Sequence, residues 1–380
     1  MYTVAFLMEQ ALGHATHCKN LRAALAADSV IEARWGLVEF PVKGPAGRVP
    51  LYRSNWTVRA GLRAVRRLNQ LTRAGAVDAV YFHTQVPAVL AHKVVRVPYI
   101  VSVDATPRQY DEQGQAYGHL PGPDWLERVK WRLNRDCFRG AARVVAFSDW
   151  AKQGLVDDYE VPASKVEVVR PGIDLIRWQA SERKRGEDRG PVKVLFVGGD
   201  FIRKGGPLLL EAFTAINDLG AELHVVTKQP VPDTPRVFVH HGLRANSPEL
   251  IQLFEDADVF CLPSNGDTLG LVFCEAGASG LPCIATNLGA LSEVVVNGET
   301  GIVIPPGDLE ALTASLRQLL EDGDLRARYG RAAREHVSRN FDSVTNGARV
   351  ASLCKEVVAA APTRPGSGRK LAPIDRAADS

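Results

Sequence analysis

The stretch that decides the fold lies in the middle of the chain, at Phe196–Pro207, and reads FVGGDFIRKGGP. Its apolar start is typical of a buried strand, and its glycines allow a tight turn. Its proline suits the first position of a helix expected over Leu208–Ile216. A buried strand that turns through glycines into a helix is the repeating unit of parallel sheets. The stretch therefore predicts an α/β fold with a doubly wound parallel sheet.

The same alternation of short β-branched runs and helical stretches recurs along the whole chain. In the first half we expect strands at Thr3–Met8, Ala79–His83, Tyr99–Val103 and Arg143–Phe147. In the second half we expect them at Val192–Val197, Glu222–Thr227, Arg236–His240, Asp258–Leu262, Pro282–Thr286 and Gly301–Ile304. Helices are expected to follow from Asp308 to about Ala361.

The length of 380 residues exceeds what one hydrophobic core usually organises, so two domains are expected. The charged segment 181–190, SERKRGEDRG, has no apolar residue and is typical of a linker. We therefore predict two Rossmann-like domains, over 1–180 and 191–345. A C-terminal helix is expected over 346–361, and a disordered tail over 362–380.

The composition, 46% apolar and 23% charged, is that of an ordinary globular protein. No apolar run is long enough to span a bilayer. The basic segment with which a secretory signal begins does not precede the first apolar run, Thr3–Met8. The six cysteines form no Cys-x-x-Cys pair, which favours a reducing cytoplasm. His14, His17 and Cys18 are close enough to suggest metal ligands, but zinc sites usually draw on more ligands, so no metal is expected.

The net charge of +3 is unevenly placed. Eight basic residues and no acidic one lie between Phe40 and Val77: Lys43, Arg48, Arg53, Arg59, Arg63, Arg66, Arg67 and Arg73. A helix within Asn55–Gly75 would place Arg59, Arg63 and Arg66 on one face. Beside that face runs an apolar stripe of Val58, Leu62, Val65 and Leu68. Such a helix can lie on an anionic membrane, or it can pack its stripe inward and leave the arginines in water. Nucleic acid is not expected as a partner, because the overall charge is small and aromatics do not alternate with the arginines.

The first candidate site is the loop of Phe196–Pro207. Arg203 and Lys204 would lie beside the first amides of the next helix, and Gly199 would end the strand. Two cations beside free helix amides form an anion site suited to a diphosphate. The alternative is that both side chains only decorate an exposed loop. No Gly-x-Gly-x-x-Gly follows the first strand and no P-loop occurs, so a nicotinamide dehydrogenase or a P-loop enzyme is not favoured.

The second candidate site follows the expected strand Asp258–Leu262. Asp267 would lie in a polar loop, and a helix would begin near Gly270, leaving the amides of Leu271 and Val272 free. Glu275 would lie one turn later on the same face. The amides suit phosphate oxygens and the carboxylates suit sugar hydroxyls. The alternative makes Asp267 a helix cap and Glu275 a solvated helix residue.

A third candidate site lies in the first half of the chain. Gly13, in the loop after the first strand, would permit close approach of a backbone to a ligand, and His14 could donate to a phosphate or a hydroxyl. Asp104 follows the expected strand Tyr99–Val103. Parallel sheets bind ligands at the carboxyl ends of their strands, so Asp104 lies where a residue that lines a binding cleft is expected. The alternatives are that His14 has only a structural role and that Asp104 caps the following turn.

From Arg143 to about Tyr329 the chain resembles glycosyltransferase family 4, a group of retaining transferases with the GT-B fold. The resemblance is carried, in order, by Ala146–Lys152, Val168–Asp174, Arg203–Gly205, Leu262–Ser264, Glu275–Ala276, Thr286–Glu293 and Asn297–Gly301. It implies two Rossmann-like domains facing across a cleft, of which 1–180 binds the acceptor and 191–345 binds the nucleotide-sugar donor. It further implies that C-terminal helices pack back on the N-terminal domain. It also implies transfer of a sugar from a nucleoside diphosphate sugar to a hydroxyl of a glycan, a lipid-linked sugar or a small molecule.

The resemblance also implies roles for four residues. Arg203 and Lys204 match the positions that neutralise the donor diphosphate, and Glu275 matches the glutamate that binds the ribose. Asp267 occupies the place of a glutamate that contacts the transferred sugar, and it is one methylene shorter.

Two further positions depart from the family pattern. Gly199 stands where many members carry another phosphate-binding arginine, which puts more weight on Arg203. Asp104 falls near where many members place a cleft histidine.

The expected mechanism needs no metal ion, because no paired Asp-x-Asp follows a strand. The cations and helix amides would stabilise the departing phosphate, which would help to deprotonate the acceptor on the same face, with retention. Two alternatives stay open: a nucleotide-sugar epimerase or hydrolase, and a non-catalytic nucleotide-sugar-binding subunit. We expect a cytoplasmic protein, one that can also lie at the inner face of the membrane.

Overall fold

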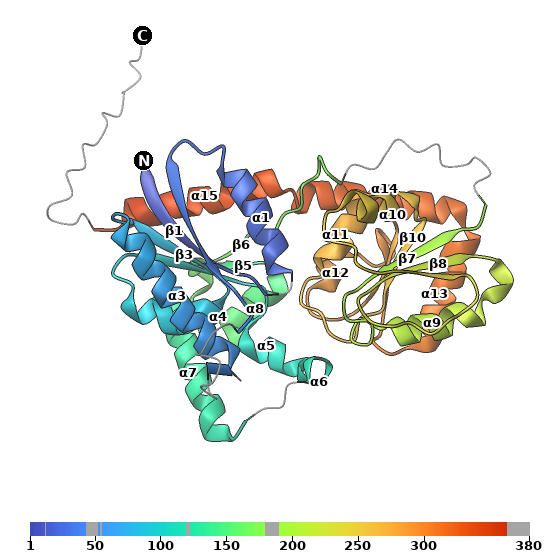
Figure 1. Ribbon diagram of the computed structural model, residues 1–380, viewed down its shortest axis with the longest axis horizontal. Coiled ribbons are helices and arrows are strands. Elements are labelled where there is room, and N and C mark those ends of the chain that lie inside the picture. Colours follow the sequence, from blue (N-terminus) through green and yellow to red (C-terminus); the bar gives the residue numbers. More distant parts are fainter. Residues whose placement is uncertain (12, 43–51, 54, 119–121, 179–189, 363–380) are drawn as a thin grey trace, which may run out of the picture.

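The computed structural model describes residues 1–11, 13–42, 52–53, 55–118, 122–178 and 190–362. Two α/β lobes lie side by side, and the C-terminal helices run along one side of both (Figure 1). Lys43 and Arg48 of the basic segment, all but Gly190 of the predicted linker, and the tail from residue 363 lie outside the described residues.

The N-terminal lobe contains a six-stranded parallel sheet in the order β2-β1-β3-β4-β5-β6. Its strands are β1 (Tyr2–Glu9), β2 (Ile31–Val38), β3 (Ala79–His83), β4 (Tyr99–Val103), β5 (Arg143–Ala146) and β6 (Val166–Val168). The central strands β3 and β4 are buried along their whole length. Strands covered on both faces need apolar side chains on both, which explains their continuous apolar runs.

Helices cover both faces of this sheet. One face carries α1 (His14–Leu25) and α15 (Ser343–Ala360), and the other carries α3 (Trp56–Arg73), α4 (Gln85–Ala91) and α7 (Asp124–Gly140). The shorter helices are η2 (His92–Val94), α5 (Pro107–Glu112), α6 (Gly114–Tyr117), α8 (Asp149–Asp157) and η3 (Ala163–Lys165). Helix α15 therefore completes the core of a lobe whose strands all precede it by more than 170 residues.

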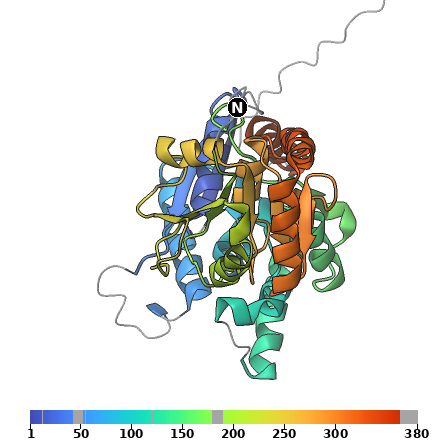
Figure 2. The ribbon, with the colours of Figure 1, turned by 90° about the vertical axis from the view of Figure 1, so that its right-hand side faces the viewer.

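The C-terminal lobe contains a second six-stranded parallel sheet, in the order β12-β11-β10-β7-β8-β9. Its strands are β7 (Lys193–Val197), β8 (Glu222–Val226), β9 (Val237–His240), β10 (Val259–Leu262), β11 (Cys283–Thr286) and β12 (Gly301–Ile304). Figure 2 shows this lobe from its outer end, with helices on both faces of the sheet. These are α9 (Gly206–Ala215), η4 (Asn217–Leu219), α10 (Pro248–Asp256), α11 (Leu271–Ala278), α12 (Leu291–Val294), α13 (Leu309–Glu321) and α14 (Gly323–Asn340).

The predicted fold class is confirmed: both lobes are doubly wound parallel α/β units, and α15 packs back on the N-terminal lobe through α1, β1 and β3. Two strands were missed by the sequence analysis. Strand β2 carries Glu32 and Arg34 and lies at the sheet edge, so its run is not continuously apolar. Strand β6 has only three residues and lies at the other edge.

The chain passes between the lobes at two places that lie side by side. The amide of Ile173 donates to the carbonyl of Phe341 at 2.8 Å, and the amide of Ser343 donates to the carbonyl of Ile173 at 3.0 Å. Gly172 packs so closely here that a Cβ atom on it would lie 2.2 Å from the Cα of Ser343. After this point Trp178 is buried against Phe254 of α10, with 5.1 Å between ring centroids.

In the helix within Asn55–Gly75, Arg59 departs from both alternatives, because it is only 4% exposed and donates to the carbonyls of Tyr52 and Arg53, each at 2.9 Å. The apolar stripe is only partly packed inward: Leu68 is buried together with the small residues of α3, whereas Leu62 is 52% exposed. The small residues let α3 approach α4 closely, and this decides which face is buried. The membrane contact of this helix stays a prediction.

All six cysteines are buried free thiols. Within the described ranges, no helix is both long and apolar enough to cross a bilayer.

Candidate functional site

The two candidate loops of the C-terminal lobe meet where the strand order of its sheet reverses. Strands β8 and β9 extend from one side of β7, whereas β10 lies on its other side and continues to β11 and β12. The loops after β7 and β10 therefore leave the sheet in opposite directions, and the crevice between them is the usual ligand site of such sheets. The structure places Gly199, Arg203 and Lys204 in the first loop and Asp267 in the second.

Direct contacts join these loops. The amide of Asn265 donates to the carbonyl of Arg203 at 2.8 Å, and the Arg203 Nη1 donates to the carbonyl of Gly266 at 2.7 Å. The Lys204 ammonium forms an ion pair with the Asp267 carboxylate. The side chains of Arg203 and Lys204 are each 15% exposed, so they do not lie on an exposed loop. They form a largely buried pair of cations, and each has a carboxylate partner: Asp200 for Arg203 and Asp267 for Lys204.

Gly205 permits this close approach of the two loops. It adopts the left-handed conformation, with φ of +77°, and caps the start of α9. A Cβ atom at this position would lie 1.8 Å from the carbonyl oxygen of Pro263. No side chain fits there, because a non-bonded carbon and oxygen need more than 3 Å.

The first turn of α11 has more free main-chain amides than that of α9. At the start of α9, the amide of Gly206 donates to the carbonyl of Phe201 at 2.8 Å and Pro207 has no N–H, so only the amide of Leu208 lacks a partner among the described residues. At the start of α11, Gly270 is the cap and supplies no side-chain hydrogen bond. The amides of Leu271 and Val272, in the first turn, have no hydrogen-bond partner among the described residues.

Glu275 lies one turn into α11 and is only 8% exposed. Burial in this apolar environment raises the pKa of its carboxyl from 4.5 to about 8. Asp267 is not the helix cap, since that position is Gly270, and its carboxylate pairs with Lys204. Neither acidic side chain therefore follows the alternative interpretation, in which one capped the helix and the other was solvated.

The N-terminal lobe has its own reversal of strand order, between β1 and β3. His14, the first residue of α1, brings its Nε2 to 3.9 Å from the Asp104 carboxylate, which follows β4. Its ring also meets His83 edge to face, with 4.9 Å between centroids. Asp104 does not cap the next helix, because Thr106 does so. Gly13 has φ of −71° and open space at its Cβ position, so no backbone strain requires glycine there.

The sequence analysis missed a buried carboxylate beside these residues. Glu9 at the end of β1 is 3% exposed, and burial raises the pKa of its carboxyl. It accepts hydrogen bonds from the Trp56 indole at 2.7 Å and from the Thr84 hydroxyl. Thr84 has φ of +70° and ψ of 160°, a conformation that costs non-glycine residues on the order of 1–3 kcal/mol. The available signal was a polar residue directly after the predicted strand Thr3–Met8.

A second missed contact joins the lobes. The Glu293 carboxylate of α12 accepts from the amides of Asp149 and Trp150, in the first turn of α8, at 3.0 and 2.8 Å. It also accepts from the Arg170 guanidinium at 3.0 Å. An acidic side chain at a helix N-terminus is stabilising there, and this one comes from the opposite lobe.

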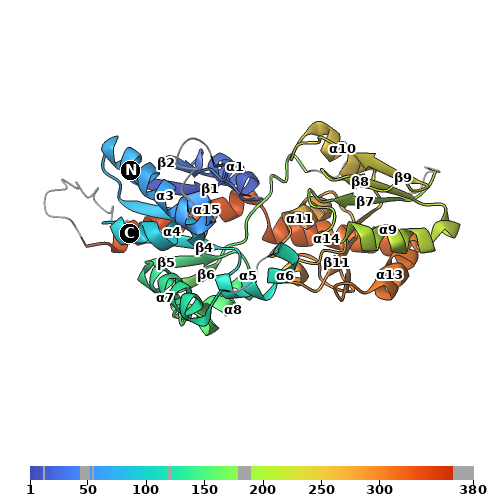
Figure 3. The same cartoon turned by 60° about the horizontal axis from the view of Figure 1, so that its bottom comes forward.

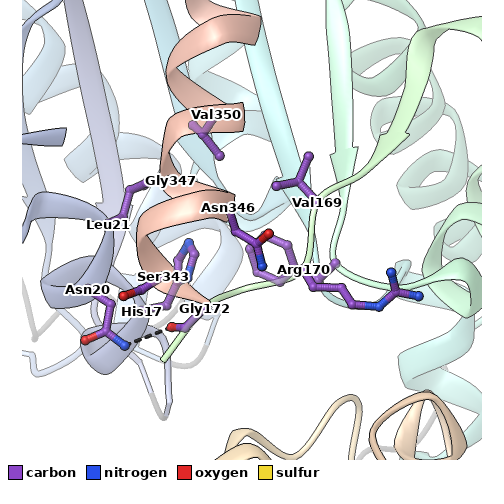
Figure 4. Close-up of a pocket in the computed structure, with 11 residues that line it drawn as sticks. His17, Asn20, Leu21, Val169, Arg170, Gly172, Ser343, Asn346, Gly347 and Val350 are labelled. Atoms are coloured by element: carbon purple, nitrogen blue, oxygen red, sulfur yellow. Dashed lines mark hydrogen bonds between the residues drawn. The ribbon is translucent and has the colours of Figure 1, made fainter. Parts of the chain in front are cut away.

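A small pocket near the crossing between the lobes is not the substrate site. His17 and Asn20 of α1 line it with Val169, Arg170, Gly172 and the start of α15 (Figure 4). Asn20 donates to the carbonyl of Gly172 at 2.9 Å. Its free volume of about 10 Å³ has room for one water molecule. Both ring nitrogens of His17 are buried without a hydrogen-bond partner among the described residues, and burial lowers its pKa to about 3. The described part of the chain holds no group of three or more His, Cys, Asp or Glu that could bind a metal ion.

Two protein-family models match consecutive parts of the chain. The model of glycosyltransferase family 4 matches residues 12–177, and that of glycosyl transferases group 1 matches residues 179–336. Together they cover both lobes.

Individual proteins resemble the chain over most of its length. The chain is 29% identical to a glycogen synthase of Mycobacterium tuberculosis over 309 residues, which cover 76% of this chain and 72% of that protein. Sucrose-phosphate synthase of Thermosynechococcus elongatus has the same fold, with a TM-score of 0.75 and 17% identity over 95% of this chain and 100% of that one. An Anabaena protein in complex with UDP-glucose matches with a TM-score of 0.66 and 18% identity, over 94% and 100%.

Proposed function

The chain belongs to the glycosyltransferases of family 4 with the GT-B fold, and from this premise we propose that it is a retaining, metal-independent hexosyltransferase. The donor is a nucleoside diphosphate sugar bound in the C-terminal lobe, and the acceptor is a sugar, a lipid-linked sugar or a small polyol. The observation that carries this is the contact of Arg203 and Lys204 with Gly266 and Asp267, in the loop that leads directly into α11. Glu275 lies one turn into that helix.

The donor site is supported by the match of its groups to the parts of a nucleotide sugar. Two cations and the amides of Leu271 and Val272 suit the diphosphate. The buried Glu275 carboxylate suits two neighbouring ribose hydroxyls, which are hydrogen-bond donors. That the Anabaena protein of the same fold was solved with UDP-glucose supports the same donor class here.

The chemistry follows from where charge develops. When the anomeric bond breaks, negative charge grows on the departing phosphate and the sugar becomes cationic. Arg203 and Lys204 are fixed in a largely buried crevice, so they stabilise this charge without reorganising. A phosphate oxygen then takes the proton of the acceptor hydroxyl, which attacks from the same face.

The acceptor lies against the carboxyl ends of β1, β3 and β4. His14 and Asp104 are the groups of that edge that can orient a hydroxyl, with 3.9 Å between the imidazole Nε2 and the carboxylate. Their chemistry suits a polyhydroxylated acceptor.

The proposal is tested by incubating the protein with a panel of nucleotide sugars, with and without acceptors. A transferase consumes donor slowly alone and faster with an acceptor, and its product keeps the anomeric configuration of the donor. Donor loss or epimerisation that no acceptor accelerates would point to a hydrolase or an epimerase. Tight nucleotide binding with no turnover would point to a non-catalytic binding subunit.

Nucleotide affinity is expected to depend on the ionisation of Glu275. Its carboxyl has a pKa of about 8 because it is buried, whereas ribose hydroxyls bind best to the ionised form. Binding should therefore strengthen as pH rises from 7 to about 8 and level off above, by at most about tenfold per pH unit. Isothermal titration with UDP, in buffers of different ionisation enthalpy, should also show that a proton is released on binding below pH 8.

The control is Glu275→Gln, which cannot ionise. It should bind UDP more weakly and lose the rise in affinity between pH 7 and 8.

The raised pKa of Glu275 also predicts how stability depends on pH. Between pH 4.5 and 8 the folded state keeps a proton that the unfolded state has released. The free energy of unfolding of the unliganded wild-type protein should therefore fall over this range, by up to about 1.4 kcal/mol per pH unit. The variant should lack this slope, and an unchanged slope would contradict the assignment.

A further inference from the structure

Helices α5 and α6 of the N-terminal lobe reach towards the donor loops of the C-terminal lobe. They extend from the carboxyl end of β4 and lie between the lobes, with α6 nearest to the second lobe (Figures 1 and 3). Their sequence, Pro107–Tyr117, belongs to none of the motifs on which the family resemblance rests.

Three contacts join this segment to the donor site. The guanidinium carbon of Arg203 lies 4.9 Å from the centre of the Tyr117 ring. The amide of Asp267 donates to the side-chain oxygen of Gln113 at 2.9 Å. Gly266 leaves no room for a side chain, because a Cβ atom on it would lie 2.6 Å from that of Ala116. Both loops of the donor crevice are therefore held from the opposite lobe.

The Arg203 guanidinium is held on three sides. Its Nη1 donates to the Gly266 carbonyl at 2.7 Å, and its Nε lies 3.3 Å from the Asp200 carboxylate. These bonds fix two edges of a flat group, and the Tyr117 ring adds a contact to its face. That ring rests in turn on Tyr110, with 4.5 Å between centroids.

An aromatic ring suits this place better than a carboxylate would. Burial raises the pKa of the Tyr117 phenol, so the side chain stays neutral. The ring attracts the cation weakly and adds no negative charge to that of Asp200. Arg203 is thereby oriented without a second carboxylate that would compete with an anion.

We propose that Tyr117 and Gln113 are positioning residues of the donor site, through which the acceptor-binding lobe orients Arg203 and the Asp267 loop for departure of the nucleoside diphosphate. This rests on the proposed function. It means that the leaving-group site is complete only when α5 and α6 lie against the C-terminal lobe.

The test compares Tyr117→Leu with Tyr117→Phe in donor turnover. Phenylalanine keeps the ring and should retain at least half of the wild-type kcat. Leucine removes it and should lower kcat by about 5–30-fold, the equivalent of about 1–2 kcal/mol, with a smaller change in donor KM. The matched control is Trp125→Leu on α7, a 63% exposed aromatic outside the site, which should leave both constants unchanged.

A double-mutant cycle separates positioning from general damage to the fold. If Tyr117 acts through Arg203, Tyr117→Leu should cost little further activity in an Arg203→Ala background. Additive losses, or an unchanged kcat for Tyr117→Leu, would overturn the proposal. Wild-type protein that turns over no nucleotide sugar would instead refute the proposed function.

Gln113→Leu gives a readout that does not need turnover. Hydrogen exchange at the Asp267 amide should speed up in this variant, while exchange in the buried strand β10 stays as in wild type. Unchanged exchange at Asp267 would remove Gln113 from the proposal.

Discussion

Replacing Lys204 with methionine is expected to lower the rate of sugar transfer by about 10²–10³-fold, as for other preorganised groups that stabilise developing charge. Methionine keeps the unbranched stem, which packs against Gly198, and removes only the charge. Because the ammonium is largely buried and fixed by Asp267, no solvent molecule reproduces its effect on the departing phosphate. Single-turnover kinetics with saturating donor would measure the loss.

The matched control tests the effect of the Asp267 carboxylate, which has no ion-pair partner once Lys204 is replaced. Without Lys204, the Asp267 side chain is a 10% exposed charge without its partner, which costs about 3 kcal/mol of stability. The double variant Lys204→Met/Asp267→Asn should recover most of that stability, as measured by thermal unfolding, but none of the transfer rate. A stable double variant with near wild-type turnover would remove Lys204 from the mechanism.

Replacing Gly205 with alanine is expected to abolish donor binding and to lower the free energy of unfolding by about 2–4 kcal/mol. The new methyl group would overlap the Pro263 carbonyl, and φ of +77° disfavours any side chain. Relief requires the loops after β7 and β10 to separate, which also separates Arg203 and Lys204 from Asp267. Chemical denaturation and titration with UDP would measure the two effects.

Gly199→Ala is the matched control in the same loop. Its Cβ position has open space around it, so the free energy of unfolding should change by less than about 0.5 kcal/mol. If the donor approaches the backbone there, the donor KM should rise although the fold is kept. A Gly205→Ala protein as stable as Gly199→Ala would contradict the close packing of the two loops.

The core strands of the fold could be predicted because burial on both faces gives them continuous apolar runs. The predicted bounds of Ala79–His83 and Tyr99–Val103 agree with β3 and β4. Edge strands escaped prediction because polar residues interrupt β2 and β6 is very short. The buried face of α3 was misjudged because small residues pack inward while Leu62 faces solvent, which hydrophobic periodicity does not reveal.

Within each lobe, strand order brings together residues that were predicted separately. Loops that follow adjacent parallel strands begin at the same edge of the sheet, so Lys204 after β7 and Asp267 after β10 can form an ion pair although 63 residues separate them. Contacts between the lobes could not be predicted in this way, since they depend on how two independent sheets are placed. Tyr117 on Arg203 and Glu293 at the start of α8 are of this kind.

The return of α15 to the first lobe has a consequence for how the protein is made. Its buried residues, Val350, Leu353, Cys354, Val357 and Val358, cover the face of the first sheet beside α1. On a ribosome, the strands of that sheet emerge long before this covering helix does. The nascent first lobe therefore leaves the apolar surface under α15 uncovered until residue 360 has left the ribosome, and exposed apolar surface of this kind favours aggregation.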